Sequence, residues 1–397
     1  MSLYASHLNW IDNEKRPMLG LLRKWAGINS HSFNLSGLGQ TANSIIKAFS
    51  PLEAVTRTYR LPKHQRINGA GKIEQVPLGK ALYFQKRPQA NRQALLVCHM
   101  DTVYGQNKPV LTKGQRVLGP GVTDAKGGIV VMLKALQAFE KSSYKNKLGW
   151  QVLINPDEEI GSPGSASLLK KLAKSADVGL VYEPCLPNGN LVGERKGSGN
   201  FTLIIRGRSA HAGRDFFSGR NAIVAAAACV TRLNALSNPK KEITVNVGKI
   251  DGGGAVNVVP ELAIVRFNIR LKKNSQQKYI LGEVRKIIQA VSKRNGVKIR
   301  LSGKFSAPPK NLDKRSLRLF KQFKSCGKTL GMDIHWQPSG GVCDGNRLAA
   351  EGLPTVDTLG VRGGNLHSPQ EYMDIDSLVK RAKLSALFLM RFANGEY

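Results

Sequence analysis

The sequence predicts an α/β protein: a main domain with a mostly parallel central sheet covered by helices, and an inserted ferredoxin-like α+β domain. Short apolar runs alternate with helical patterns early in the chain and again late in it, which is typical of a sheet covered on both faces. Between these parts lies the order strand, helix, strand, strand, helix, strand, which is that of a ferredoxin-like unit. The 397 residues also exceed the roughly 250–300 that one core usually holds.

The elements of the main domain follow from apolar runs and helical spacing. The expected strands lie at 81–86, 94–100, 149–155 and 178–183, and late in the chain at 332–337 and 354–359. The expected helices lie at 127–140, 163–175, 314–329 and 376–393. An amphipathic helix also fits the N-terminal apolar positions Trp10, Met18, Leu21, Leu22 and Trp25. This segment has no continuous apolar run, so we expect no signal peptide.

The inserted domain is predicted at 198–305, which leaves 1–197 and 306–397 as the two parts of the main domain. Its first helix, within "GRNAIVAAAACVTRLNAL", is nearly without charge from Ala222 to Val230. A small two-layer domain has one core face, so a second apolar face on this helix would suit a contact with another subunit.

"GLGQTA" at 37–42 resembles a dinucleotide-binding fingerprint, but it follows a polar turn, so we interpret it as the start of a helix.

Composition restricts the class of protein. No apolar run approaches the roughly 20 residues that cross a bilayer. The five cysteines are scattered and form neither a metal pattern nor a disulfide framework, which indicates buried thiols in a reducing compartment. The net charge of +33 raises the alternative of nucleic-acid or acidic-membrane binding. The basic residues are dispersed and lack interleaved aromatics, however, so a solvated basic surface is favoured, with attraction of an anionic substrate as a further option.

The stretch "LVCHMDTV" ends an apolar strand in two polar residues, His99 and Asp101. Residues two apart in a strand face the same side, so both emerge at the carboxyl end, where open α/β sheets bind ligands. Asp101 could accept the second ring N–H of a metal-ligating His99. This pair alone is equally consistent with a buried histidine satisfied by an acid.

Further acids and imidazoles follow other strands and loops. Asp124 lies in the glycine-rich "GPGVTDAKGG", Glu158 and Glu159 follow a strand in "INPDEEIGS", Glu183 ends the strand "LVYEP", and His367 lies in "GGNLHSPQEY". The adjacent acids after the strand need a compensating cation. Histidine and carboxylate ligands suit Zn²⁺, with Co²⁺ or Mn²⁺ as substitutes. Hydrolases with such ligand sets usually hold two metals about 3.5–4 Å apart.

Together these motifs, with "SAHAG" in the inserted domain, resemble those of the dizinc aminoacylase and carboxypeptidase family. This family includes acetylornithine deacetylase, succinyl-diaminopimelate desuccinylase and glutamate carboxypeptidase. The resemblance spans about residues 10–395 in the right order, and 339–372 look most like the glutamate carboxypeptidase branch. The inserted domain would then be a lid and dimerisation domain on a catalytic domain.

The resemblance implies a role for each matching residue. Asp124 would bridge two Zn²⁺ ions, His99 and Glu183 would complete one site, and Glu159 and His367 the other. Glu158 would be the general base that takes a proton from the metal-bridging water and hands it to the leaving amine, and Asp101 would orient His99.

In the inserted domain, the resemblance makes His211 a hydrogen-bond donor to the oxyanion, either within the chain or from the partner of a homodimer. Asn257 and Arg270 would hold the substrate, with the Arg270 guanidinium suited to a carboxylate. Gly340 and Gly341 would offer backbone N–H groups near the same end.

We therefore predict a cytoplasmic dizinc hydrolase, without a membrane or nucleic-acid partner, that cleaves an amide or peptide bond beside a free carboxylate. N-acyl-amino-acid deacylase, desuccinylase and dipeptidase activities remain alternatives. The alternative outside enzymes is a basic nucleic-acid-binding pseudoenzyme, which would have no need to keep Glu158 beside an intact ligand set.

Overall fold

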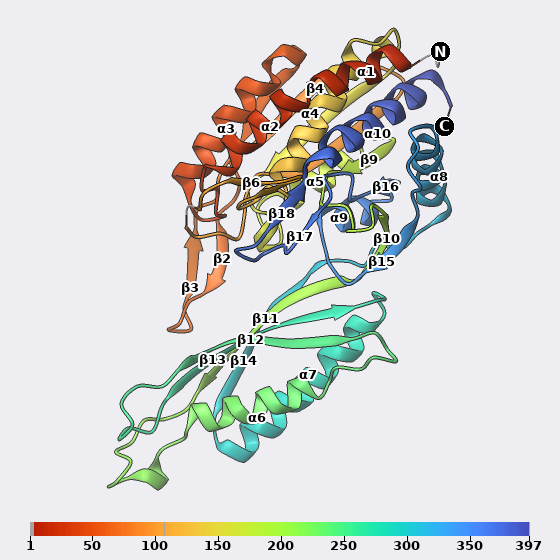
Figure 1. Cartoon of the computed structure of the whole chain (residues 1–397). Helices are drawn as coiled ribbons and strands as arrows, with labels where there is room; N and C mark the ends of the chain where they lie inside the picture. The colour runs from red at the N-terminus through yellow and green to blue at the C-terminus, as the bar shows by residue number, and fades with distance from the viewer. Residues whose placement is uncertain (1–3, 107, 397) are drawn as a thin grey trace.

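The computed structural model describes residues 4–106 and 108–396 and has two parts (Figure 1). The larger part holds both ends of the described chain, and the smaller part is an insertion drawn below it. This confirms the predicted fold class. None of the helices in the described residues is long and apolar enough to cross a membrane.

The main domain contains a six-stranded sheet in the order β1-β4-β8-β5-β9-β16. The strands β8, β5, β9 and β16 are parallel to one another, and β4 is antiparallel to both β1 and β8. The sheet is therefore mixed, with its parallel part at the centre and one edge. Its strands are β1 (Val55–Tyr59), β4 (Ala81–Lys86), β5 (Gln93–His99), β8 (Gly149–Asn155), β9 (Val178–Val181) and β16 (Thr355–Val356).

Alternate residues of these strands pack on opposite faces of the sheet. In β5, Leu96 and Cys98 join the larger hydrophobic core, whereas Leu95 and Val97 join a second core on the other face. Both faces are thus covered, which explains why the strands appear in the sequence as continuous apolar runs. The larger core lies under α1 (Ala5–Asn13), α2 (Lys15–Ala26), α3 (Leu35–Phe49), α4 (Lys126–Glu140), α8 (Lys314–Thr329) and α10 (Ile375–Asn394). The second lies under α5 (Ala166–Ala173) and α9 (Asp344–Ala350).

Helix α4 is buried along nearly its whole length and packs tightly on the sheet. A Cβ atom at Gly128 would lie 2.1 Å from the carbonyl oxygen of Tyr182, so the close approach of α4 to the end of β9 requires glycine there. The predicted N-terminal helix is divided into α1 and α2. "GLGQTA" does lie at a helix start, because the Asn34 side chain accepts a hydrogen bond from Gly37 N in the first turn of α3.

The inserted domain, hereafter the lid, contains a four-stranded antiparallel sheet in the order β12-β13-β11-β14 with two helices on one face. This is the predicted ferredoxin-like arrangement. Its elements are β11 (Gly197–Arg206), α6 (Ala222–Asn234), β12 (Thr244–Gly252), β13 (Leu262–Leu271), α7 (Gln276–Asn295) and β14 (Lys298–Ala307). The domain limits at 198 and 305 stay a prediction.

Smaller elements complete the main domain. They are β2 (His64–Ile67), β3 (Ile73–Val76), β6 (Leu111–Lys113), β7 (Arg116–Leu118), β10 (Leu191–Arg195), β15 (Trp336–Ser339), β17 (Gly363–Gly364) and β18 (Tyr372–Asp374), with 3₁₀ turns η1 (Ser50–Leu52), η2 (Lys145–Lys147) and η3 (Glu158–Ile160). A further 3₁₀ turn, η4 (Phe216–Ser218), lies in the lid. The strand expected at 332–337 begins only at Trp336, and it pairs with β10 in a separate parallel ribbon. The strand expected at 354–359 is only two residues long in the central sheet.

Candidate metal centre

Five predicted ligands come from separate strand ends and loops and converge at one edge of the central sheet. His99 is the last residue of β5, Glu183 follows β9, and Asp124 precedes α4. Glu159 lies in η3 after β8, and His367 lies in the loop between β17 and β18. Because β5, β8 and β9 are parallel, their carboxyl ends meet at the same edge.

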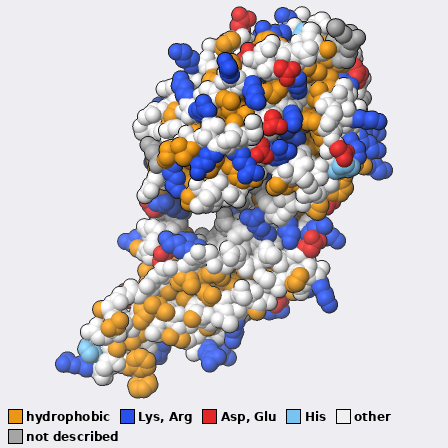
Figure 2. All heavy atoms as spheres, in the orientation of Figure 1, with side chains coloured by type: hydrophobic (Ala, Val, Ile, Leu, Met, Phe, Trp, Pro, Cys, Tyr) orange, Lys and Arg blue, Asp and Glu red, His pale blue; other side chains and the backbone are white. Residues whose placement is uncertain are grey.

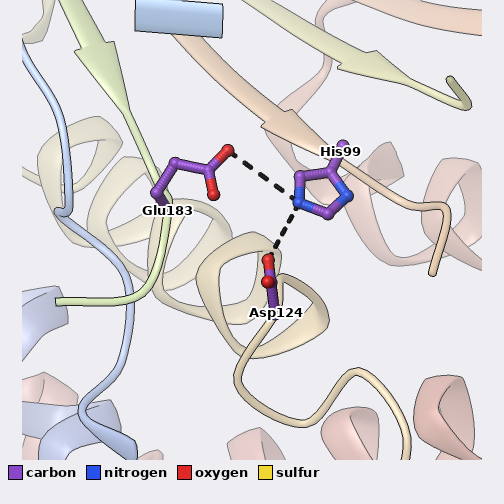
Figure 3. Close-up of side chains that lie close together, drawn as sticks. All are labelled: His99, Asp124 and Glu183. Carbon is purple, nitrogen blue, oxygen red and sulfur yellow. Dashed lines mark hydrogen bonds and ion pairs between the residues drawn. The ribbon is translucent and has the colours of Figure 1, made fainter. Parts of the chain in front are cut away.

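His99, Asp124 and Glu183 point toward one another (Figure 3). His99 Nε2 lies 3.1 Å from Asp124 Oδ1 and 3.8 Å from Glu183 Oε1. The other ring nitrogen, Nδ1, is 3.0 Å from the backbone carbonyl of Asp101. Since that carbonyl can only accept, Nδ1 carries a hydrogen, and Nε2 is the ring nitrogen that faces the acids, where it either donates to Asp124 or ligates a cation.

A second cluster contains Asp124, Glu159 and His367. His367 Nε2 lies 3.3 Å from Asp124 Oδ2 and 3.2 Å from Glu159 Oε2. Asp124 thus turns one carboxylate oxygen toward each cluster, which is the placement that a bridging ligand needs. One edge of the site is open, because the side chain of His367 is 54% exposed whereas that of His99 is 1% exposed.

Burial and mutual repulsion shift the titration of these acids. Burial raises the pKa of Glu183 to about 8, and burial together with the charge of Glu183 raises the pKa of Glu158 well above its ordinary value. Hydrogen bonds to Asp124 and Glu159 raise the pKa of His367 to about 10. Burial would raise the pKa of Asp124, but hydrogen bonds from His367 and His99 outweigh it and lower that pKa. The cluster therefore requires positive charge, supplied either by protons or by cations.

The geometry gives Asp101 a wider role than the orientation of His99. Its carboxylate accepts from the backbone N–H groups of Glu158 and Glu159, each at 3.1 Å, and from Ser32 Oγ at 2.7 Å. His99 Nδ1 is 3.4 Å from the same carboxylate. Asp101 thus ties the end of β5 to the turn that bears the predicted base and one ligand. Ser32 was not predicted from the sequence, because nothing in its neighbourhood marks it.

Glu371 was also missed. This buried carboxylate accepts from the backbone N–H groups of Gly121, Thr123 and Asp124, at 3.1, 2.8 and 3.0 Å, and from the hydroxyl of Tyr104. It therefore holds the glycine-rich loop that carries Asp124. The only signal in the sequence is its place four residues after His367 in "LHSPQEY".

Two other acids near the site have structural partners. Asp157 directly precedes Glu158 and Glu159 in the sequence. It accepts from the backbone N–H groups of Gly164 and Ser165, so its charge does not depend on a cation. Asp344 accepts from Asn155 and Ser162 and lies 3.6 Å from the guanidinium of Arg347.

A cavity of about 380 Å³ adjoins the second cluster and extends to the lid. Glu158, Glu159 and His367 of the main domain line it, as does the predicted substrate residue Arg270 of the lid. Arg270 donates to the carbonyl of Gly340 at 2.6 Å, while the N–H of Gly341 already donates to Ser339 Oγ. The lining thus combines acids of the main domain with two basic side chains, Arg270 of the lid and Arg347 of the main domain.

His211 and Asn257 are not among the described residues that line this cavity. They lie beside each other elsewhere in the lid, where Ala212 N donates to the carbonyl of Asn257. The Nδ1 atom of His211 accepts from the backbone N–H groups of Gly213 and Arg214, which leaves Nε2 to carry a hydrogen. Within the single chain, then, the structure does not bring these two residues to the candidate centre.

The donor set fits a pair of divalent cations. Each cluster offers one imidazole nitrogen and two carboxylates, and each set of ligand atoms lies within 4.8 Å. This nitrogen and oxygen chemistry is that of zinc and its common substitutes, and no cysteine takes part. All five cysteines are free and buried, as expected.

Comparisons with known proteins agree with this geometry. The family model for peptidase family M20/M25/M40 matches residues 95–391. Carboxypeptidase G2 from Pseudomonas sp. (strain RS-16) is 28% identical over 318 residues, which cover 78% of this chain and 76% of that protein. Succinyl-diaminopimelate desuccinylase from Nitrosospira multiformis is 26% identical over 281 residues, covering 68% and 72%. The solved structure of the di-peptidase Dug1p from Saccharomyces cerevisiae superposes with a TM-score of 0.78 at 17% identity, over 99% of each chain, and shows the same fold.

Proposed function

The chain belongs to peptidase family M20/M25/M40, a family of metal-dependent hydrolases of peptide and amide bonds, and on this basis we propose that it releases an amino acid with a free carboxylate from a peptide or acyl group. The family resemblance predicted from the motifs is thereby confirmed, as is the prediction of an enzyme. The observation that carries the finer proposal is the cavity that adjoins the second metal-competent cluster, which shares Asp124 with the first, and that is also lined by the half-buried Arg270.

The proposed ligands are His99, Asp124 and Glu183 for one Zn²⁺ and Asp124, Glu159 and His367 for the other. Bound cations would supply two things: a lowered pKa for water and polarisation of the scissile carbonyl. Asp101 and Glu371 hold the backbone of the turn and the loop that bear Glu158 and two of these ligands, Glu159 and Asp124.

Glu158 is the proposed general base. It begins η3, three residues after the end of β8, lines the cavity beside Glu159, and has its backbone N–H fixed by Asp101. In this role its carboxylate takes a proton from the attacking water and returns it to the leaving amine. Arg270, which lines the same cavity from the lid, binds the carboxylate of the departing amino acid through charge-assisted hydrogen bonds. The carbonyl of Gly340 accepts from Arg270 and so helps to orient the guanidinium.

We propose that the protein acts as a homodimer through the lid, with His211 and Asn257 completing the site of the neighbouring subunit. Helix α6 buries Ala222, Ala225 and Cys229 against the lid sheet but exposes Ile223 and Val224. Further exposed apolar side chains of the lid are Phe216, Phe217, Ile250, Val256 and Val258. Figure 2 shows hydrophobic side chains gathered over the lid. A contact on this apolar surface would explain why His211 lies away from the site of its own chain.

Deacylase, desuccinylase and dipeptidase activities stay within the proposal, since relatives and structural neighbours carry such names. The nucleic-acid-binding alternative is not favoured, because the base and both ligand clusters are assembled in one place. The free cysteines support a reducing compartment, and a cytoplasmic location stays a prediction.

The decisive experiment is a hydrolysis screen of the zinc-loaded protein. N-acyl amino acids, N-succinyl amino acids and dipeptides would each be paired with the same compound carrying a C-terminal amide. We expect cleavage of one class, with a marked preference for the free carboxylate. Equal cleavage of acid and amide would reject the role of Arg270, and no cleavage of any class would reject the proposed reaction.

A further inference from the structure

Asn268 occupies a central place in the wall of the cavity that faces the metal-competent clusters. It lies on β13 two residues before Arg270, and in the register of the lid sheet it is opposite Asn200, while Arg270 is opposite Ser198. Residues two apart on one strand and opposite each other on neighbouring strands share a face. These four polar residues therefore lie on the same face of the lid sheet, and all four line the cavity.

The side-chain amide of Asn268 contacts all three of its polar neighbours in this group, Ser198, Asn200 and Arg270. Its Nδ2 atom lies 2.8 Å from Ser198 Oγ, 2.7 Å from Asn200 Oδ1 and 3.2 Å from the backbone carbonyl of Gly199. Its Oδ1 atom accepts from Arg270 Nε at 3.2 Å.

The orientation of this amide is dictated by two neighbours of fixed character. A backbone carbonyl can only accept a hydrogen bond, so the atom of Asn268 that faces Gly199 must be the NH₂ group. A guanidinium can only donate, so the atom that faces Arg270 must be the oxygen. Both requirements agree, and a flipped amide would violate both at once.

This orientation determines what the neighbours present to the cavity. Asn200 offers its oxygen to Asn268, so its own NH₂ group is left as a donor. Ser198 Oγ accepts from Asn268, so its hydroxyl hydrogen is likewise left to donate. Arg270 keeps donors beyond those used by Asn268 and by the carbonyl of Gly340. The wall therefore presents donors to a ligand.

The charge of Arg270 is not neutralised from within this wall. Among the described residues no acid forms an ion pair with Arg270, and burial lowers the pKa of its guanidinium, as expected for a cation removed from water without a counter-charge. A neutral amide at position 268 satisfies Nε and leaves the positive charge available. An aspartate of nearly the same shape would neutralise that charge and face Gly199 with an acceptor.

We propose that Asn268 is the specificity-determining positioning residue of this site: its amide orients Ser198, Asn200 and Arg270 into a wall of hydrogen-bond donors that selects a carboxylate over a neutral carboxamide. This inference deepens the proposed function and rests on it, since the selected carboxylate is that of the departing amino acid.

The test compares two nearly isosteric variants with a matched control. Asn268→Asp reverses the polarity of the wall, and Asn200→Asp keeps the oxygen that Asn268 contacts while replacing the donor that faces the cavity. Asn274→Asp makes the same change of charge at an exposed lid position outside the cavity. We expect KM for the best acid substrate to rise about 10- to 100-fold in the first two variants, with a much smaller change in kcat, because charge-assisted hydrogen bonds are lost.

The preference for acid over amide should fall by the same factor in both variants and stay unchanged in Asn274→Asp. Unaltered selectivity in Asn268→Asp and Asn200→Asp, or an equal loss on acid and amide, would overturn the inference. The melting temperature is measured for each variant, and Asn200→Asp alone decides the matter if Asn268→Asp does not fold.

A binding measurement separates this inference from the proposed reaction. In the zinc-loaded Glu158→Ala background the ligand is not consumed, so calorimetry can compare N-acetyl-L-alanine and N-acetyl-L-glutamate with their C-terminal amides. Tighter binding of the acids that is lost on adding Asn268→Asp supports the inference even if no substrate is cleaved. If the acids bind tighter with or without Asn268→Asp, the inference fails and the carboxylate-binding proposal stands.

Discussion

Asp124 illustrates how much of the chemistry depends on single side chains. Its two carboxylate oxygens face different imidazoles, Oδ1 toward His99 and Oδ2 toward His367, at 3.1 and 3.3 Å. The neighbours Glu158 and Glu159 also differ in their surroundings. Both line the cavity, but only Glu159 belongs to a metal-competent cluster. The geometry therefore supports the different roles that the family resemblance implies for these adjacent residues of the same charge.

Replacement of Glu158 by alanine should separate chemistry from metal binding. We expect kcat to fall about 10²- to 10⁴-fold, the usual contribution of a positioned general base, while two equivalents of zinc are retained. Metal analysis by atomic emission, together with steady-state kinetics, checks this. Glu159→Ala is the matched control and should lose zinc. Loss of zinc from Glu158→Ala would make Glu158 a ligand instead.

Zinc binding should release protons near neutral pH. Burial raises the pKa of Glu183 to about 8, and hydrogen bonds raise that of His367 to about 10, so the metal-free protein carries protons on these ligands at pH 7. A cation must displace them, and zinc affinity should therefore increase as the pH rises from about 6 to 8. Calorimetry in two buffers of different ionisation enthalpy measures the protons released. Proton release of zero at pH 7 would contradict these shifts.

At the scale of elements, the site depends on short connections held by buried acids. Asp101 joins the end of β5 to η3, and Glu371 joins the loop after β17 to the loop before α4. Each acid accepts from backbone N–H groups, which positions a loop without contributing a ligand. The site is therefore rigid where the central sheet supports it and open at His367.

Glu371→Ala should loosen the loop that carries Asp124. Three buried N–H groups would lose their acceptor, so we expect zinc affinity to fall about 10- to 100-fold, as for other residues that hold metal ligands in place. Amide exchange at Gly121, Thr123 and Asp124 should become faster. Glu351→Ala, which removes an acid paired with the exposed Lys170, is the control and should change neither quantity. Unchanged exchange in the Glu371 variant would rule out this role.

At the scale of the whole molecule, the lid supplies one wall of the cavity and carries a second polar group, His211 and Asn257, that its own cavity does not use. The exposed apolar surface around α6 lies on the same domain. Both observations are accounted for if two lids pair and each delivers His211 to the other subunit.

Mixing two inactive variants tests this pairing. If His211 acts across the dimer, a heterodimer of Glu158→Ala and His211→Ala subunits contains one site with both residues intact. Equal mixing after dissociation should then restore about a quarter of wild-type activity, since half of the dimers are mixed and each has one competent site. Either variant alone, carried through the same procedure, is the control. No recovery, despite mixed dimers seen by native mass spectrometry, would place His211 in its own chain's site or exclude it from catalysis.

The sequence by itself determined the fold class, most of the strands and helices, and the kinds of ligand. These depend on local properties: continuous apolar runs indicate strands covered on both faces, and histidines and acids at strand ends indicate a metal site because their chemistry does not depend on their neighbours. The helix expected at 314–329 was found at Lys314–Thr329, for example, because its apolar spacing is regular and Asp313 caps it.

The tertiary structure decided what depends on contacts between residues far apart in the chain. It placed β15 beside β10 rather than in the central sheet, shared Asp124 between two clusters, and kept His211 away from its own chain's cavity. Asp101, Glu371 and Asn268 acquire their importance from hydrogen bonds to backbone and amide groups, which no pattern of residue types records. A sequence states which groups can donate, accept or ligate, but distance and orientation, on which these interactions depend, exist only in the folded chain.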